Sequence, residues 1–179
     1  MKHTLLPLLA LALLTQCHKS APDPAKPEDQ LPAATQTGAD TFGCLVNGQP
    51  YTPKGYVGSA NFAVLFDPTY RGGNLEVRTY RVDGNTRQYL TLGGDGIAKT
   101  GVFPLERQYN TGLSYTNTTL AFPCNGYRSA DTQVYYKGAL TITRLDQQAG
   151  IVSGTFNCKL WQPGCDTLRF TQGRFDYKL

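Results

Sequence analysis

The chain has 179 residues, of which 40% are hydrophobic and 17% charged, and its net charge is +4 at pH 7. Beyond residue 40, fourteen Lys or Arg stand against nine Asp or Glu, with no run of adjacent basic residues. That distribution lacks the concentrated basic stripe that nucleic-acid binding needs, so no nucleic-acid partner is expected.

The first sixteen residues have the three parts of an export signal. Lys2 and His3 form a short basic region, and an apolar run follows from Leu5 to Leu14. A membrane-spanning helix needs roughly 20 apolar residues, so this run is too short to serve as a stable span. Residues 1–16 are therefore predicted to be a signal peptide, which places the mature chain outside the cytoplasm.

The residues at the end of this run, Leu14-Thr15-Gln16-Cys17, resemble a bacterial lipobox, in which the chain is cut before the cysteine and the cysteine is acylated. Gln16 stands where Gly, Ala or Ser is usual, and this loose form is similar to that of Bacteroidota lipoproteins. The resemblance implies a lipidated Cys17 and an outer-membrane lipoprotein, displayed on either the periplasmic or the surface face. Several acyl chains would hold it on the membrane permanently. The competing interpretation is an ordinary secretory signal cut elsewhere.

Residues 17–40 are predicted to be the lipidated cysteine and a proline-rich tether. From His18 to Asp40 the chain contains four prolines, and Leu31 is the only large apolar side chain. Such a composition buries too little apolar surface to fold. Its 23 residues would reach between roughly 25 Å as a coil and about 70 Å as an extended chain. The segment would lift a domain off the membrane.

From Thr41 onward the pattern predicts short strands joined by tight turns. Asn47-Gly48 between two apolar stretches predicts one hairpin, and Asp83-Gly84-Asn85 between LEVRTYRV and RQYLTL predicts another. Further strands are expected around Phe62 to Phe66, over VFPLE and, past a polar loop, over Thr118 to Cys124.

The C-terminal part has the clearest alternation of apolar and polar side chains. In TQVYYKGALTITR and IVSGTFNCKL the alternation is typical of a sheet with one face in water. The last segment begins in one phase, with Leu168 and Phe170, and ends in the other, with Phe175, so a β-bulge is expected beside Gly173. Residues 41–179 are therefore predicted to form one all-β domain. We favour an antiparallel sandwich, with a closed or partly open barrel as the alternative.

Two ends of this domain resemble an uncharacterised family of Bacteroidota lipoproteins. The similar stretches are FGCLVNGQPYTP at the start and GALTITRLDQQAGIVSGTFNC with DTLRFTQGRFDYKL at the end. The family shares a G-x-L-x-I-T-x-L-D strand, a V-S-G-T-F strand and a final G-R-F-D strand. The resemblance implies an exported, lipid-anchored β domain and provides no catalytic residues to carry over.

Five cysteines leave one over if the others pair, and a lipidated Cys17 would account for the odd one. Export permits disulfides. We expect Cys158–Cys165 across the Pro163-Gly164 turn and Cys44–Cys124 closing a loop of about 80 residues, which would contribute about 4 kcal/mol in the chain-entropy model. A zinc site is the rival interpretation, but the spacing contains no C-x-x-C pair, so no metal is expected.

Catalytic chemistry has little support in the sequence. The two histidines, His3 and His18, lie outside the predicted domain, so histidine-activated nucleophiles and histidine metal sites are excluded there. A glycosidase would depend on Glu76, Glu106 or an aspartate, with two carboxyls about 5–9 Å apart. Glu76 is more simply explained as a surface charge beside Arg78. We expect no catalytic residues and no cofactor.

Aromatic side chains are the more informative feature. All eleven tyrosines lie at or beyond Tyr51, and Trp161 is placed near the tip of the last hairpin. Strands favour tyrosine, and many of these rings would pack inward. An exposed set around Trp161 could instead bind a glycan or an envelope protein. The preferred function is a non-catalytic binding or structural lipoprotein, and the alternative is a carboxylate-dependent hydrolase of surface glycans.

Overall fold

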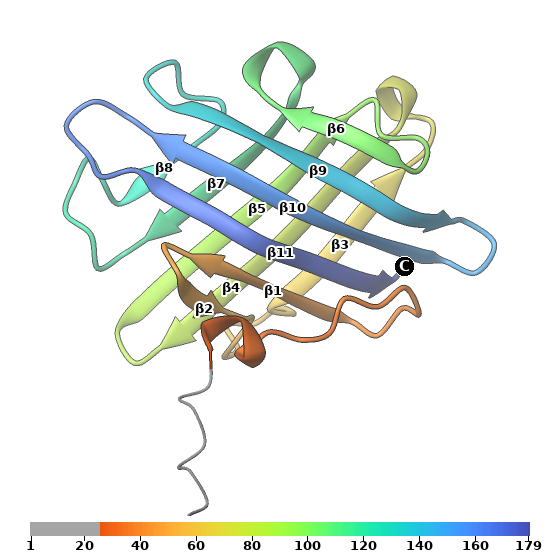
Figure 1. Ribbon diagram of the computed structural model, residues 1–179, viewed down its shortest axis with the longest axis horizontal. Helices are drawn as coiled ribbons and strands as arrows, with labels where there is room; N and C mark the ends of the chain where they lie inside the picture. The colour runs from red at the N-terminus through yellow and green to blue at the C-terminus, as the bar shows by residue number, and fades with distance from the viewer. Residues whose placement is uncertain (1–25) are drawn as a thin grey trace, which may run out of the picture.

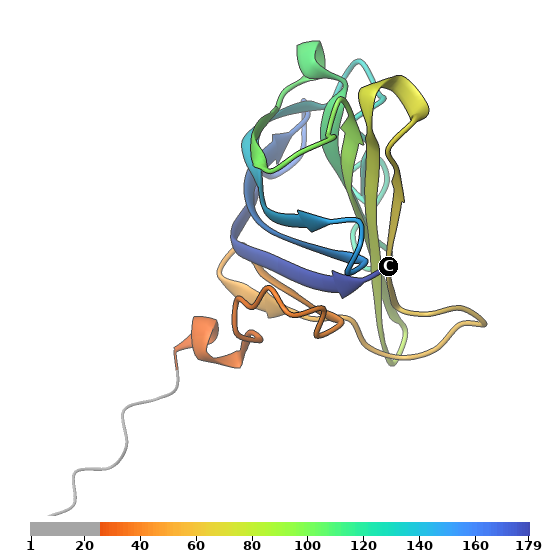
Figure 2. The ribbon, with the colours of Figure 1, turned by 90° about the vertical axis from the view of Figure 1, so that its right-hand side faces the viewer.

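The computed structural model describes residues 26–179, so the predicted signal peptide and Cys17 lie outside the described residues. The domain is an antiparallel β-sandwich of two separate sheets, as favoured from the sequence, and neither sheet closes into a barrel. Figure 1 views the first sheet face-on with the second behind it, and Figure 2 shows the two layers from the side. Within residues 26–179 no helix is long and apolar enough to cross a bilayer.

The first sheet has six strands and the second has five. In spatial order the first contains β2 (Gln49–Tyr51), β1 (Thr41–Val46), β11 (Leu168–Lys178), β10 (Ile151–Trp161), β9 (Tyr135–Asp146) and β6 (Gly101–Leu105). The second contains β3 (Phe62–Asp67), β4 (Asn74–Asp83), β5 (Thr86–Asp95), β7 (Thr111–Asn117) and β8 (Gly126–Tyr127). Three single-turn 3-10 helices, η1 (Pro27–Gln30), η2 (Tyr70–Gly72) and η3 (Arg107–Tyr109), complete the described secondary structure.

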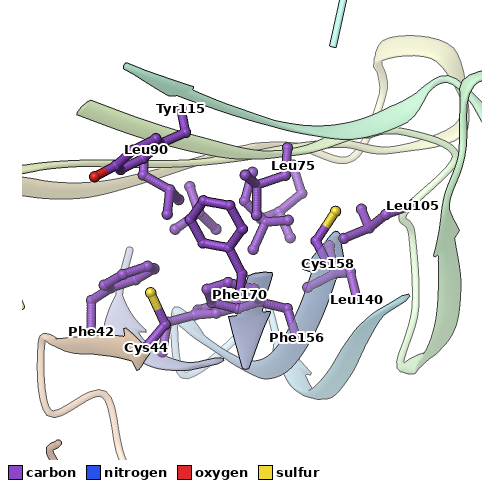
Figure 3. Close-up of a cluster of buried hydrophobic side chains, with 14 of the residues drawn as sticks. Phe42, Cys44, Leu75, Leu90, Leu105, Tyr115, Leu140, Phe156, Cys158 and Phe170 are labelled. Carbon is purple, nitrogen blue, oxygen red and sulfur yellow. The ribbon is translucent and has the colours of Figure 1, made fainter. Parts of the chain in front are cut away.

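The core lies between the two sheets because alternate residues of each strand point inward. Figure 3 shows Phe42, Phe156 and Phe170 of the first sheet facing Leu75 and Leu90 of the second. Some of the aromatic rings pack edge to face, as with Tyr115 and Phe170, whose centroids are 5.4 Å apart. The opposite face of each sheet is thereby left for polar side chains.

The predicted hairpins and the predicted bulge are confirmed. Asn47 and Gly48 both have positive φ and join β1 to β2, as a tight two-residue turn requires. In the pairing of β10 with β11, Asn157 alone stands opposite Thr171 and Gln172, and Gln172 has φ of 55°. This bulge, immediately before Gly173, produces the phase change read from the sequence.

The prediction of a strand over Thr118 to Cys124 is wrong. The strand is β7, which occupies the segment expected to be a polar loop, and residues 118–125 form turns. Leu113 and Tyr115 of β7 are buried against the core while Ser114 and Thr116 face outward, so β7 does alternate. Small polar residues on its outer face concealed that alternation.

The tether predicted over residues 17–40 is shorter than expected, because its described part packs on the domain. Leu31 is buried, and Pro32 lies against Gly43 of β1. Asp176 of β11, itself buried, accepts hydrogen bonds from the backbone N–H groups of Thr37, Gly38 and Ala39 at 2.8–3.1 Å. Sequence composition missed this attachment because a buried carboxylate on a distant strand holds the segment together with its one large apolar side chain, Leu31.

The predicted disulfide pairing is also wrong. The bond joins Cys124 to Cys165, while Cys44 and Cys158 are free and buried in the core. Strand β11 lies between β1 and β10, which carry these two thiols, so they are two strand spacings, or about 10 Å, apart. A disulfide spans at most about 7 Å between Cα atoms, which excludes that pair.

Candidate ligand-binding face

The outward side of the first sheet carries a stacked aromatic pair. Trp161 is the last residue of β10 and lies directly opposite Tyr135, the first residue of β9. Their ring centroids are 4.3 Å apart and their planes differ by 13°. Trp161 is 42% exposed and Tyr135 is 50% exposed. The pair therefore stabilises the β9–β10 register while presenting a flat aromatic surface to solvent.

The disulfide fixes the corner of the sandwich beside this pair. Cys165 lies in the loop after β10, and Cys124 lies in the loop after β7. Gln162, next to Trp161, donates its side-chain amide to the carbonyl oxygen of Pro123 at 3.0 Å. Phe122 on the same stapled loop is 88% exposed. The aromatic end of the sheet is thus held by covalent and hydrogen-bonded links to the second sheet.

A row of three cations crosses the same face one step from the aromatic pair. Lys159 of β10 lies directly opposite Lys137 of β9 on one side and opposite Arg169 of β11 on the other. All three are exposed, in contrast to their buried neighbours Cys158 and Leu160. Like charges directly opposite each other destabilise a sheet, so this row has an energetic cost.

Carboxylates on this face offer the row little compensation. Glu106 approaches Lys137 at 3.8 Å. Lys159 and Arg169 form no ion pair with any residue in the range 26–179. The exposed positive charge therefore remains available to an external anion.

A shallow depression of about 310 Å³ continues the face beyond the cationic row. Its floor includes the small side chains Ala139, Thr141 and Thr155, and Arg174 borders it beside the bulge. Ala34 of the N-terminal segment forms part of its wall. The aromatic pair, the cations and this polar hollow together form one open surface, which we call the ligand face.

The carboxylates that a hydrolase would need are engaged elsewhere. Glu76 accepts a hydrogen bond from Arg78 at 2.6 Å, and Asp95 accepts hydrogen bonds from Asn74 and Arg71 at 2.8 and 3.0 Å. Hydrogen bonds, the larger contribution from Asn74 and the smaller from Arg71, hold the pKa of Asp95 below its ordinary value. A general acid needs the opposite shift. Glu76 and Asp95 do share a depression of about 440 Å³ on the second sheet, whereas Glu106 lies at the edge of the first sheet.

The two free thiols and the aspartate of the β4–β5 turn form neither a catalytic nor a metal site within residues 26–179. Burial raises the pKa of Cys158 to about 12 and raises that of Cys44 further, which keeps both as inert thiols. Asp83 pairs with Lys54 and Arg81 in its turn. Within residues 26–179 no group of three or more His, Cys, Asp or Glu side chains is placed to hold a metal ion.

Sequence reasoning found Trp161 but missed the cationic row. Each of the three cations stands at a polar position of an alternating strand, and that signal is present in the sequence. What places them side by side is the register of three strands. Exposed tyrosines elsewhere do not contribute to this face. Tyr56 lies in the loop between β2 and β3, and Tyr70 lies in η2.

Comparison of the chain with family models, with curated proteins and with solved structures finds no match.

Proposed function

We propose that this chain is a non-catalytic, lipid-anchored cell-envelope protein whose β-sandwich binds a glycan on the ligand face. The observation that carries the proposal is the exposed stack of Trp161 on Tyr135. A flat, rigid aromatic surface suits the apolar face of a sugar ring, and aromatic side chains lose little conformational entropy on binding.

The surroundings of the stack support a glycan better than a peptide. The ligand face is open and floored by small polar side chains, whereas helix-in-groove recognition needs an apolar groove. The strands that carry the stack are interior strands of their sheet, and beside the stack only the short β9 segment Tyr135–Lys137, beyond its pairing with β6, has an edge without a partner strand.

The hydrolase alternative has weaker support. Among the described carboxyls whose pKa is displaced, each is displaced downward by its hydrogen bonds. None of these residues has the raised pKa of a general acid.

The proposal is tested by binding of the detergent-solubilised full chain to an array of neutral and acidic polysaccharides. Trp161→Ala should weaken binding by about ten-fold or more, which is the usual effect of removing an aromatic anchor. Trp161→Phe should retain most of the affinity, and Tyr56→Ala, which removes an exposed tyrosine from a distant loop, should not change it. Equal binding by Trp161→Ala and the unchanged chain would refute the site. Turnover of any bound polysaccharide would favour the hydrolase instead.

A further inference from the structure

Building on the proposed function, we propose that the ligand is a polyanionic glycan, a polysaccharide bearing carboxylate or sulfate groups, read by the cationic row of Lys137, Lys159 and Arg169. These residues occupy one line across β9, β10 and β11. Neighbouring strands lie about 4.8 Å apart, so three positive charges fall within about 10 Å.

The fold does not require this row. Opposed cations in a sheet cost stability relative to neutral or oppositely charged pairs. Within residues 26–179, Lys159 and Arg169 form no ion pair, and Lys137 approaches only Glu106, at 3.8 Å. The row is distinguished by three cations held side by side by the strand register, and an external anion is the group that would neutralise it.

Two acidic residues at the opposite end of this sheet are engaged by other protein groups. Asp176, on the outward side of β11, is covered by the N-terminal segment and is saturated by hydrogen bonds from Thr35, Thr37, Gly38, Ala39 and Ser153. Asp146 is bonded to Arg144. A negatively charged chain would thus meet cations at the row and Arg174 at the far border of the depression, with Glu106 at one side.

The dimensions of the face favour a linear polymer. From Trp161 to Thr155 along β10 is six residues, which corresponds to about 20 Å. One ring could stack on the aromatic pair while the following sugar residues cross the cations and enter the depression. Figure 1 faces this surface, with the β9–β10 end that carries the aromatic pair on the left.

An anionic bilayer is the competing occupant, and the shape of the face disfavours it. A flat surface of headgroups cannot follow the depression between Ala34 and Arg174. In addition, η1, where the described chain begins, contacts the β1–β2 edge of the sheet, away from the aromatic end. A polysaccharide chain can enter a shallow depression, whereas a flat membrane surface would lie across it without filling it.

The test measures binding of the full chain, in detergent, to polygalacturonate, dextran sulfate and neutral dextran by calorimetry at two salt concentrations. We expect binding to the two anionic polymers, weakening as salt rises because exposed charge pairs are screened. Lys159→Gln and Arg169→Gln should each weaken it by roughly three- to five-fold, and the double variant by about ten-fold or more. Lys99→Gln removes an exposed lysine outside the row and serves as the matched control.

Stability separates loss of binding from loss of fold. Lys159→Gln relieves two like-charge contacts, so its melting temperature should stay equal to that of the unchanged chain or rise. A variant with a lower affinity for the anionic polymers and an unchanged or higher melting temperature identifies the row as a binding element.

Each other outcome overturns the inference in a distinguishable way. If neutral dextran binds as well as the anionic polymers and only Trp161→Ala matters, glycan binding stands and the anionic class is wrong. If no polysaccharide binds, both proposals fail. If vesicles of phosphatidylglycerol bind through Lys159 and Arg169 while polymers do not, the row serves the membrane and the glycan assignment is wrong.

Discussion

Replacing the Asp176 carboxylate by an amide, Asp176→Asn, should detach the N-terminal segment from the sandwich. One carboxylate oxygen accepts from Thr35 Oγ1 and from the N–H groups of Thr37 and Ala39, and the other accepts from Gly38 N–H and Ser153 Oγ. An amide keeps one acceptor oxygen and turns the other position into a donor. At least one partly buried N–H then loses its partner, at about 1–3 kcal/mol, and the remaining bonds lose their charge assistance.

The expected total is about 3 kcal/mol, a large share of the 5–15 kcal/mol that typically stabilises a domain. For a domain of about 150 residues this corresponds to a fall in melting temperature of roughly 6–12 °C. Asp166→Asn is the matched control, because Asp166 is exposed and its side chain forms no hydrogen bond within residues 26–179; this variant should unfold like the unchanged chain.

The effect should depend on pH in a defined direction. Burial on its own would raise the pKa of Asp176, but hydrogen bonds from Ser153, Thr35, Thr37 and Gly38 outweigh it and hold the pKa well below its ordinary value. A carboxyl with a lowered folded-state pKa contributes stability that is complete above its unfolded value, about 4, and is lost as pH falls below it. The difference between the unchanged chain and Asp176→Asn should therefore be full at pH 7 and smaller at pH 3.

Urea unfolding at both pH values measures this difference. Hydrogen exchange of the Thr37, Gly38 and Ala39 amides locates it, because these amides should lose protection in Asp176→Asn. An unfolding free energy at pH 7 within about 0.5 kcal/mol of the unchanged chain, the range of an ordinary surface substitution, would refute the reasoning.

Three further outcomes are expected. Cys44 and Cys158 should resist iodoacetamide in the native protein at pH 8 and react after unfolding in guanidinium, because burial keeps both thiols protonated. Labelling of the native chain at either position would contradict their burial. Gly173→Ala should cost about 1–3 kcal/mol in urea unfolding, since a Cβ there would lie 2.6 Å from the ring of Phe156; unchanged stability would contradict that packing. Intact mass of membrane-extracted protein should carry an added lipid mass on Cys17, and a mature chain without it would exclude acylation.

Local patterns in the sequence were sufficient for much of the fold. Asn47-Gly48 specifies its hairpin because both residues accept positive φ. The change of phase between Phe170 and Phe175 located the bulge before Gly173, since a period of two admits no other way to move from one face to the other. Strand β7 was not predicted because its outer face consists of small polar residues that are equally common in loops.

Contacts between distant segments could not be derived in the same way. Four cysteines in a β domain allow three pairings, and only the order of β1, β11 and β10 keeps Cys44 and Cys158 apart. Likewise the N-terminal segment reads as unfolded on composition, yet Asp176, more than 130 residues away, organises it. The sequence contains both partners but not their proximity.

For the ligand face too, one part follows from the sequence pattern and the other from the tertiary structure. Alternation along each strand determines that Lys137, Lys159 and Arg169 point outward and that Trp161 joins them, because residues two apart share a face. Whether these side chains stand in one row depends on how three strands align, and a shift of one residue would have sent a different set outward. That register is decided by the bulge at Gln172, the hairpin turns and the packed core. The sequence by itself determined the chemistry of the face, and the tertiary structure decided that its charges act together.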